Sequence, residues 1–433
     1  MVWVHFALLF ACIIYAAKLG GIGVGMAGGL GMAICMFVFG MKPGFIPVDV
    51  ILIIMTVIFA CSVMHVAGGM DWLIRFSANV LRKNPKYINY LAPLVTFVLT
   101  VLSGTGYTAM AVLNVIQEVA KQNGIRPSQP LTGAVIASQI AITASPISAA
   151  TAAMWVTVET MGVSFGHALM VLLPSAFFAS AVAAVIAGWQ GVDLAKDPIF
   201  LDRMSKGLVD MKPAKAANEP LPAGAFKSVV IFLCSVFFIV GMLLFKEQIG
   251  HSFGSRDIIV VTMLMAGILM YWFCGVDLSQ VKNSSIFKGG AESLIVILGI
   301  VWLSSTVILP YMPAIQETAT VLLGQYPFLL AGAFMAVSAL LFSQGSTSAL
   351  LVPVAASLGC DAGTILASFV ACSALFITNV YPTTAFAIAC DDTGSFMGKW
   401  SGSMVVNHPF FIPGMVGMIA AIPVGFFLAS IFL

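Results

Sequence analysis

The chain has 433 residues, of which 60% are hydrophobic and only 8% are charged, and its formal net charge is +2. A soluble domain carries about 25% charged residues, so this composition cannot form a water-facing surface. The net charge is uninformative about partners, and no basic block in the sequence indicates a nucleic-acid partner.

Ten continuous apolar runs are long enough to cross a bilayer core, which takes roughly 20 helical residues. Together with a mean hydropathy of +1.06 they predict an all-α polytopic membrane protein, because a barrel would need short alternating segments. The first run has no basic segment or cleavage site and is interpreted as a mature helix. The predicted spans are 2–17, 20–39, 48–67, 131–158, 168–189, 226–245, 258–274, 291–309, 364–390 and 410–433.

Two further apolar stretches, at about 90–120 and about 328–358, are interrupted in the middle by glycine and small polar residues. The segment 191–225 is polar and rich in proline and basic residues, which predicts a linker between two halves, 1–190 and 226–433. The eight cysteines include no CxxC pair, which favours buried helical side chains over a metal site.

The distribution of Lys and Arg predicts a side of the membrane for each loop. If the basic linker is cytoplasmic, so are segment 71–89, with Arg75 and Arg82, and the loop with Lys121 and Arg126. Both ends of the first interrupted stretch then lie on one side, so it is predicted to be a re-entrant hairpin. The loops flanking the second stretch contain no Lys or Arg, which predicts a hairpin inserted from the opposite side. Both termini are expected to be external.

A long apolar helix with a polar centre follows each hairpin, at 131–158 and at 364–390. Each centre contains Ile-Thr and then a proline among hydroxyl residues. Proline interrupts the helical ladder, and irregular backbone at membrane depth is tolerated only against protein or a water-filled cavity. Each half therefore runs through three spans, a hairpin, a broken span and a final span, in opposite orientations. We predict inverted repeats of about five spanning helices plus one re-entrant hairpin each.

The two hairpin tips and the two helix breaks form the predicted substrate site. Each exposes the N-terminus of a following helix, which carries about +0.5 charge, so four converging N-termini suit a doubly ionised dicarboxylate. Carbonyls of the preceding helices suit a coupling cation. Hydroxyls and amides serve either sign of charge, and single hydroxyls also serve helix packing, so these residues leave the sign of the substrate open. The predicted binding residues are Ser103, Gly104, Thr105, Gly106, Thr108, Thr143, Ser145, Pro146, Ser148, Ser343, Gln344, Gly345, Ser346, Thr347, Ser348, Thr378, Asn379, Tyr381, Pro382 and Thr383.

Other polar residues allow two interpretations each. Glu118 and Glu292 border apolar runs, either as capping carboxylates or as proton relays. Asp391 and Asp392 end the second broken helix, either as a solvated end or as a contact with a partner or gate. Three histidines near helix ends favour interfacial roles over ligation: His65, His167 and His408.

Glycines are frequent in the second predicted span. Residues 23–28 match GxGxxG, but no strand precedes them, which argues against dinucleotide binding. Gly21, Gly25 and Gly29 recur every four residues, which predicts a face for close helix packing.

Several segments together resemble the anaerobic C4-dicarboxylate transporter (Dcu) family, over nearly the whole chain. The resemblance is closer to the DcuA-like branch than to DcuB-like members. The segments that carry it are GGIGVGMAGGLG (20–31), VAGGMDWL (66–73), LRKNPKYI (81–88), SGTG (103–106), SQIAITASPISAA (138–150), ACDDTGS (389–395) and NHPFFIPG (407–414).

This resemblance implies a secondary transporter or exchanger of fumarate, malate, succinate and aspartate in a bacterial inner membrane. The external side, on which the basic residues place both termini, is then the periplasm. The two-hairpin layout is also similar to the wider ion-transporter superfamily, which implies an elevator-type architecture with a scaffold that is often a homodimer. We expect no metal or organic cofactor, and a sodium ion or proton as the candidate coupling cation at the helix breaks. Two alternatives stay open: a dicarboxylate-binding partner of a membrane sensor kinase, and a carrier of another small anion coupled to a cation. The sequence contains no HExxH, DFG or nucleophile-elbow motif, which argues against an enzyme.

Overall fold

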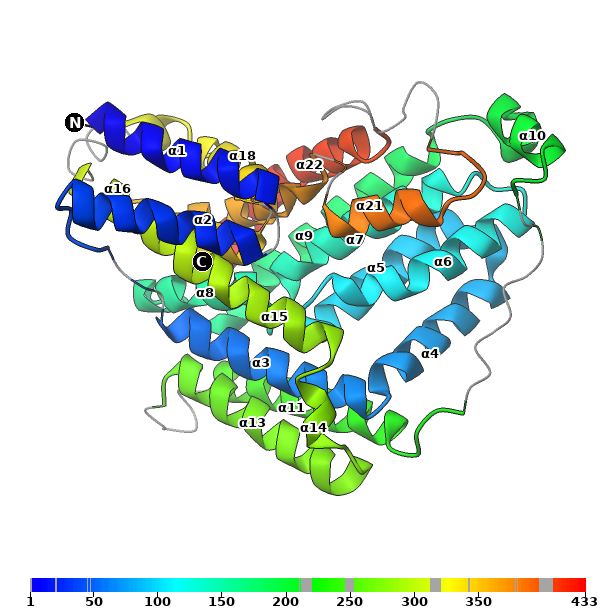
Figure 1. Cartoon of the computed structure of the whole chain (residues 1–433), viewed down its shortest axis with the longest axis horizontal. Coiled ribbons are helices and arrows are strands. Elements are labelled where there is room, and N and C mark those ends of the chain that lie inside the picture. The colour runs from blue at the N-terminus through cyan, green and yellow to red at the C-terminus, as the bar shows by residue number, and fades with distance from the viewer. Residues whose placement is uncertain are drawn as a thin grey trace.

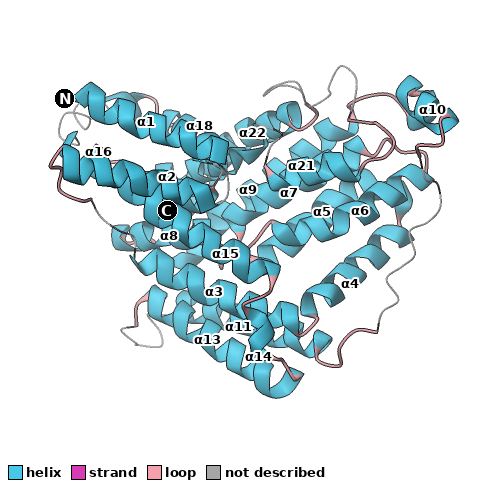
Figure 2. Ribbon diagram, in the orientation of Figure 1, coloured by secondary structure: helices cyan, strands magenta, loops and turns pink. Residues whose placement is uncertain are grey.

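The fold is known from a computed structural model, which describes a chain made of helices. The described residues are 2–19, 22–44, 46, 48–209, 211, 220–245, 253–311, 321–341, 343–377, 379, 381–396 and 408–433. Within these ranges there are helices and connecting loops but no strand (Figure 2).

The first half of the chain contains nine helices before the polar segment. Several of them are extended or interrupted by short irregular turns, which include η1 (Ile34–Val38) and η3 (Ile142–Ala144). The helices are α1 (Val2–Leu19), α2 (Ile22–Ala33), α3 (Val48–Val66), α4 (Gly69–Lys83), α5 (Ile88–Ser103), α6 (Tyr107–Gln122), α7 (Ser128–Ala141), α8 (Ala149–Val158) and α9 (Phe165–Gly188).

In the second half a short helix in the polar segment precedes the spans. Its irregular helical stretches include η6 (Ile297–Val301) and η8 (Phe369–Ile377). The helices are α10 (Pro198–Ser205), α11 (Ala225–Leu244), α13 (Ser255–Cys274), α14 (Leu278–Val281), α15 (Ser285–Val296), α16 (Trp302–Ile308), α18 (Leu329–Leu341), α19 (Gln344–Ser357), α20 (Ala362–Ser368), α21 (Pro382–Cys390) and α22 (Phe411–Phe432).

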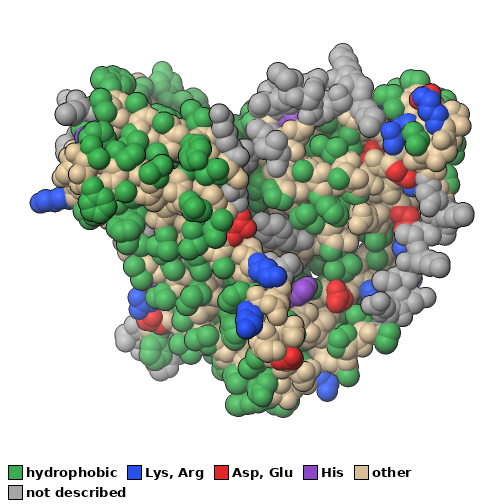
Figure 3. Space-filling view, viewed as in Figure 1, with side chains coloured by type: hydrophobic (Ala, Val, Ile, Leu, Met, Phe, Trp, Pro, Cys, Tyr) green, Lys and Arg blue, Asp and Glu red, His purple; other side chains and the backbone are tan. Residues whose placement is uncertain are grey.

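The helices have the length and composition of membrane spans. Among the described residues, 8 helices are long and apolar enough to cross a membrane, or up to 9 if a bent pair counts as one span. Hydrophobic side chains also dominate the face shown in Figure 3, where charged side chains gather in only a few places. The prediction of an all-α polytopic membrane protein is confirmed.

The helices labelled in Figure 1 are divided into two groups by the elements that they contain. We call α5 to α9 and α18 to α22 the hairpin bundle, because it contains both helical hairpins and both broken helices. Within it α22 packs along α9, α5 and α9 pack on α7, and α19 packs on α8. The remaining spans, which we call the outer helices, are α1, α2, α3, α11, α13, α15 and α16; α3 packs on α13 and α15, and α2 packs on η6. Each half of the chain contributes to both groups.

The outer helices α2 and α15 with η6 cross at backbone contact. A Cβ atom added at Gly299 would lie 2.0 Å from the carbonyl oxygen of Gly25, and one at Gly28 would lie 2.3 Å from the carbonyl carbon of Gly299. The predicted glycine face is therefore correct at Gly25 but wrong at Gly29, where no atom lies within 4 Å of an added Cβ. The crossing helix contacts Gly25 and Gly28, which are three residues apart. Gly21 lies outside the described residues.

Segments expected to be loops contain helices. The predicted cytoplasmic segment 71–89 lies mostly in α4, and the linker includes α10. Helix α4 is amphipathic, because apolar residues such as Met70 and Leu81 are buried while the basic Arg82 and Lys83 occupy its last turn. Positive residues at a helix C-terminus interact favourably with the helix dipole.

The basic segments that were predicted to share one side contact each other. Arg82 at the end of α4 pairs with Glu118 on α6 at 3.0 Å. Lys121, also on α6, pairs with Asp392 after α21 at 2.7 Å, and Arg203 on α10 donates to the Asp392 carbonyl. Arg126 pairs with Asp197, the residue before α10. These contacts place the α4 end, the α6–α7 loop, α10 and the loop after α21 at one end of the molecule.

The two aspartates after α21 make contacts within the chain, while the Asp392 side chain stays 29% exposed. The interpretation as a contact with a partner or gate stays a prediction. The Asp391 carboxylate accepts hydrogen bonds from the backbone N–H groups of Thr393 and Ser395, at 3.0 and 2.7 Å. Arg126 donates to the carbonyl oxygen of Ser395 at 2.7 Å. The loop is ordered by its own carboxylate and is then held by basic residues from the first half.

Candidate functional site

The first hairpin turns between Ser103, the last residue of α5, and Tyr107, the first of α6. Gly104 caps α5 with φ of 70°, a conformation that favours glycine. The Thr108 hydroxyl donates to the carbonyl of Thr105 at 2.9 Å and lies 3.0 Å from the Ser103 hydroxyl. These hydroxyls therefore hold the tip in shape.

The first helix break lies against this tip. A Cβ added at Gly104 would lie 3.1 Å from the side chain of Ile147, in the break between η3 and α8. The Ser145 hydroxyl donates to the carbonyl of Val101 on α5 at 2.7 Å. Ser148 caps α8, accepting from the N–H of Thr151, and its hydroxyl donates to the carbonyl of Ile142 at 2.6 Å. The Thr143 hydroxyl donates to the carbonyl of Ile140 within the helix.

The second hairpin tip meets the other side of the same break. A Cβ added at Gly345 would lie 3.2 Å from the Cβ of Ala149, and the Ser348 hydroxyl donates to the carbonyl of Ala150 at 2.8 Å. One turn further along both helices, Ala349 and Ala153 belong to one apolar cluster. Because the partners advance in the same direction, α8 and α19 run parallel, and their N-termini start side by side.

Local hydrogen bonds shape the second tip. Ser343 caps α19 by accepting from the N–H of Ser346 at 3.1 Å, and it donates to the Ser346 hydroxyl. The Thr347 hydroxyl donates to the carbonyl of Ser343 at 2.7 Å. Thr347 is fully buried, so its hydroxyl stabilises the first turn of α19 rather than facing solvent.

A pair of glutamines connects the second tip to the second break. Gln344 donates to the backbone carbonyl of Gln139 on α7 at 2.7 Å, and the Gln139 side chain donates to the Thr383 hydroxyl on α21 at 3.0 Å. The helices on either side of this break are bent by 47°. Asn379 and Tyr381 are half-buried there, and Pro382 starts α21. Thr378 lies outside the described residues.

The four predicted polar breaks are therefore linked to one another by a continuous series of direct contacts. The first tip touches the first break, the first break touches the second tip, and the second tip is joined through α7 to the second break. However, the hydroxyl protons of Thr108, Ser145, Ser148, Thr347 and Ser348 already have carbonyl acceptors. An anion at this place would rely more on backbone N–H groups at the helix starts than on these hydroxyls.

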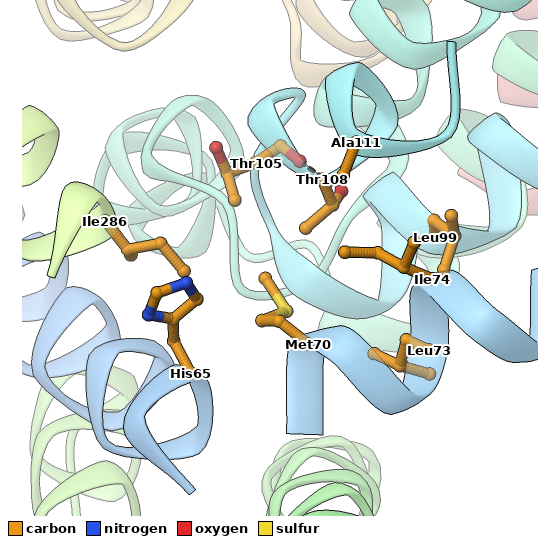
Figure 4. A pocket seen from close by; sticks show the side chains of 9 residues that line it. All are labelled: His65, Met70, Leu73, Ile74, Leu99, Thr105, Thr108, Ala111 and Ile286. Atoms are coloured by element: carbon orange, nitrogen blue, oxygen red, sulfur yellow. Dashed lines mark hydrogen bonds between the residues drawn. The ribbon is translucent and has the colours of Figure 1, made fainter. Parts of the chain in front are cut away.

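Two adjacent cavities border the first tip, and both are lined by Thr105 and Ile286. The first has a volume of about 130 Å³ and lies between α4, α5, α6 and the end of α3 (Figure 4). The second, of about 110 Å³, reaches Ile147 and Ala149 in the first break and faces Cys61 on α3. The two cavities thus lie where the hairpin bundle meets the outer helices.

The structure adds residues that the sequence did not single out as binding residues. His65, at the end of α3, lines the first cavity. Gln139 joins the two glutamine contacts, although it lies within a predicted span. Ile286 on α15 closes both cavities from the outer helices. For His65 and Gln139 the only sequence signal was a polar side chain at the edge of, or inside, an apolar run, and Ile286 carried no signal.

Comparisons with known proteins all point to one class, membrane transporters. The profile of a family described as "Anaerobic c4-dicarboxylate membrane transporter" matches residues 1–433. The chain is 40% identical over 435 residues to "C4-dicarboxylate transporter DcuA" of Wolinella succinogenes, covering 98% of both chains. It is 42% identical to the protein of the same name in Escherichia coli strain K12, covering 100% of both. It is 30% identical to "Anaerobic C4-dicarboxylate transporter DcuB" of Escherichia coli O6:H1, covering 99% of this chain and 98% of that one.

Proposed function

Because this chain belongs to the family of anaerobic C4-dicarboxylate membrane transporters, and to a transporter family rather than an enzyme family, we propose that it exchanges four-carbon dicarboxylates across the bacterial inner membrane. Fumarate, malate, succinate and aspartate are the proposed substrates. The observation that carries the proposal is the convergence of two hairpin tips on one helix break, beside cavities that are lined by Thr105.

Helix starts supply the anion-binding character of this place. The α8 and α19 N-termini lie side by side, and the α6 N-terminus follows directly after the tip that borders both cavities. Each N-terminus carries about +0.5 charge and unpaired N–H groups. Three such ends offer roughly +1.5 before screening, which compensates most of a dicarboxylate's charge. The tips themselves contain neither Lys nor Arg.

The arrangement of helices supports an elevator mechanism as part of the proposal. Both hairpins and both broken helices belong to the hairpin bundle, and each half of the chain contributes one of each. Movement of this bundle against the outer helices would carry the tips and their cavities across the membrane. The inverted repeat with two re-entrant hairpins, and the position of both termini in the periplasm, belong to the same proposal and follow from the distribution of basic residues.

A coupling cation, either a sodium ion or a proton, is also proposed. The side-chain oxygens Oε1 of Gln139 and Gln344 are buried and have no hydrogen-bond partner among the described residues. Uncharged oxygen atoms of this kind suit a hard cation. Sodium-dependent exchange in otherwise identical buffers would identify which cation is used.

The decisive experiment is exchange in proteoliposomes. Purified protein is inserted into liposomes loaded with unlabelled fumarate, and labelled fumarate or succinate is added outside. We expect uptake only in vesicles that contain a dicarboxylate inside. Well-inserted protein that binds succinate but exchanges none would favour the role of a sensor partner, and protein that neither binds nor exchanges any dicarboxylate would refute the proposal.

Thr105→Val is expected to lower the affinity for succinate by about tenfold, because Thr105 lines both cavities and its hydroxyl is replaced by a methyl group of similar size. Binding to detergent-purified protein measures the change. Thr160→Val is the matched control, since Thr160 is exposed and lies in the turn after α8. Equal affinities in the two variants would remove Thr105 from the site.

A further inference from the structure

His65 occupies an unusual position for a residue at the end of a membrane helix. It follows Met64 in the last turn of α3, yet its ring lines the first cavity together with Thr105 and Thr108. Figure 4 shows the His65 ring and the Thr105 side chain entering the same space from two different elements, one from the outer helices and one from the hairpin bundle. Among the described residues, none makes a hydrogen bond to the His65 ring.

The lining of the two cavities gives His65 a distinct chemical role. Their other lining residues are apolar, hydroxyl-bearing or glycine, apart from Cys61, whose thiol donates to the carbonyl of Ser103. His65 is thus the one side chain of this lining that can carry a positive charge. A carboxylate is costly to remove from water unless it is paired or hydrogen-bonded. Imidazole donates at least one N–H in either protonation state.

The opposite wall of the first cavity attracts anions in another way. Thr105 and Thr108 belong to the tip and to the first turn of α6, so this wall is formed by the start of a 16-residue helix. Helix starts present N–H groups and partial positive charge. The cavity therefore has two anion-attracting features on different walls, His65 on α3 and the start of α6.

We propose that His65 is the specificity-determining residue that binds the second carboxylate of the substrate, while the start of α6 holds the first. This inference rests on the proposed function and goes beyond it by naming the group that separates dicarboxylates from monocarboxylates. A four-carbon chain extends from the tip toward α3, and its distal carboxylate accepts the imidazole N–H. An analogue with an amide in place of that carboxylate loses the charged part of this hydrogen bond.

The test compares succinate with succinamate, in which one carboxylate is an amide. Binding of both to the purified full-length chain is measured for the wild type, for His65→Leu and for His65→Gln. The wild type is expected to prefer succinate. His65→Leu is expected to weaken succinate binding by about tenfold and to reduce the preference for succinate over succinamate at least fivefold. His65→Gln keeps an N–H donor and is expected to retain part of the affinity.

His167→Leu is the matched control, because His167 is exposed at the start of α9 and lines neither of the two cavities. It is expected to leave both affinities within twofold of the wild type. An unchanged preference in His65→Leu, in protein that unfolds at the same temperature as the wild type, would overturn the role of His65 alone. If the wild type binds neither ligand, the proposed function fails first, and this inference fails with it.

Discussion

Gly299→Val is expected to prevent the chain from reaching a stable, monodisperse form in detergent. A Cβ at this position would lie 2.0 Å from the Gly25 carbonyl oxygen and 2.6 Å from the Gly25 Cα, and these are backbone atoms that no rotamer can move aside. The two helices would have to separate, which would also open the apolar cluster formed by residues such as Cys35 and Ile300. We expect a loss of more than about 3 kcal/mol, seen as a fall of at least about 3 °C in the unfolding temperature of any protein that can be purified.

Neighbouring glycines on α2 provide the control for this prediction. Gly28→Val should behave like Gly299→Val, because its Cβ would lie 2.3 Å from the backbone of Gly299. Gly29→Val should stay within about 0.5 kcal/mol of the wild type, because no atom lies within 4 Å of the added Cβ. The two α2 substitutions are chemically identical and adjacent, so helix propensity cannot explain a difference between them. Similar unfolding temperatures for both would disprove the backbone crossing.

Asp197→Asn is expected to destabilise the chain by about 3 kcal/mol, because it leaves the Arg126 guanidinium buried without its carboxylate. The side chains of Arg126 and Asp197 are 11% and 3% exposed. Asp197 also caps α10 by accepting from the N–H of Ile199 at 3.0 Å, and asparagine caps a helix about equally well. The substitution therefore tests the charge pair and leaves the cap in place. Thermal unfolding of the purified protein measures the loss.

A second, exposed pair shows what the same chemical change costs without burial. Asp202 and Lys206 pair at 2.7 Å, but their side chains are 57% and 61% exposed. Asp202→Asn should therefore cost no more than about 0.5 kcal/mol. Combining Arg126→Met with Asp197→Asn removes the unpaired charge and is expected to be less harmful than Asp197→Asn alone. A double variant that is less stable than both single variants would contradict this account.

The positions of the breaks could be predicted because each contains residues that interrupt an apolar helix, namely glycine, proline or a run of small polar residues. Gly104 permits the turn after α5, and α8 starts directly after Ser148, two residues beyond Pro146. At the other hairpin, α19 begins at Gln344, inside the predicted polar run. Local chemistry decides these positions, so the sequence around each one is sufficient to find it.

The partners of these residues could not be predicted in the same way. Lys121 and Asp392 are 271 positions apart, and nothing near either one indicates the other. The glycine face failed at Gly29 because the angle of the crossing helix, rather than a four-residue period, decides which glycines touch. His65 reads as an interfacial residue in the sequence, since only the folded chain shows that the first tip lies beside the end of α3.

Bridges between the halves reduce the importance of the covalent connection between α10 and α11. Arg203 on α10 holds the backbone of Asp392, Lys121 holds its carboxylate, and Ser348 in the second half donates to Ala150 in the first. The long packing of α22 along α9 adds a further contact of this kind. Two fragments made separately, one ending after α10 and the other beginning before α11, would therefore have the complementary surfaces needed to recombine into one transporter.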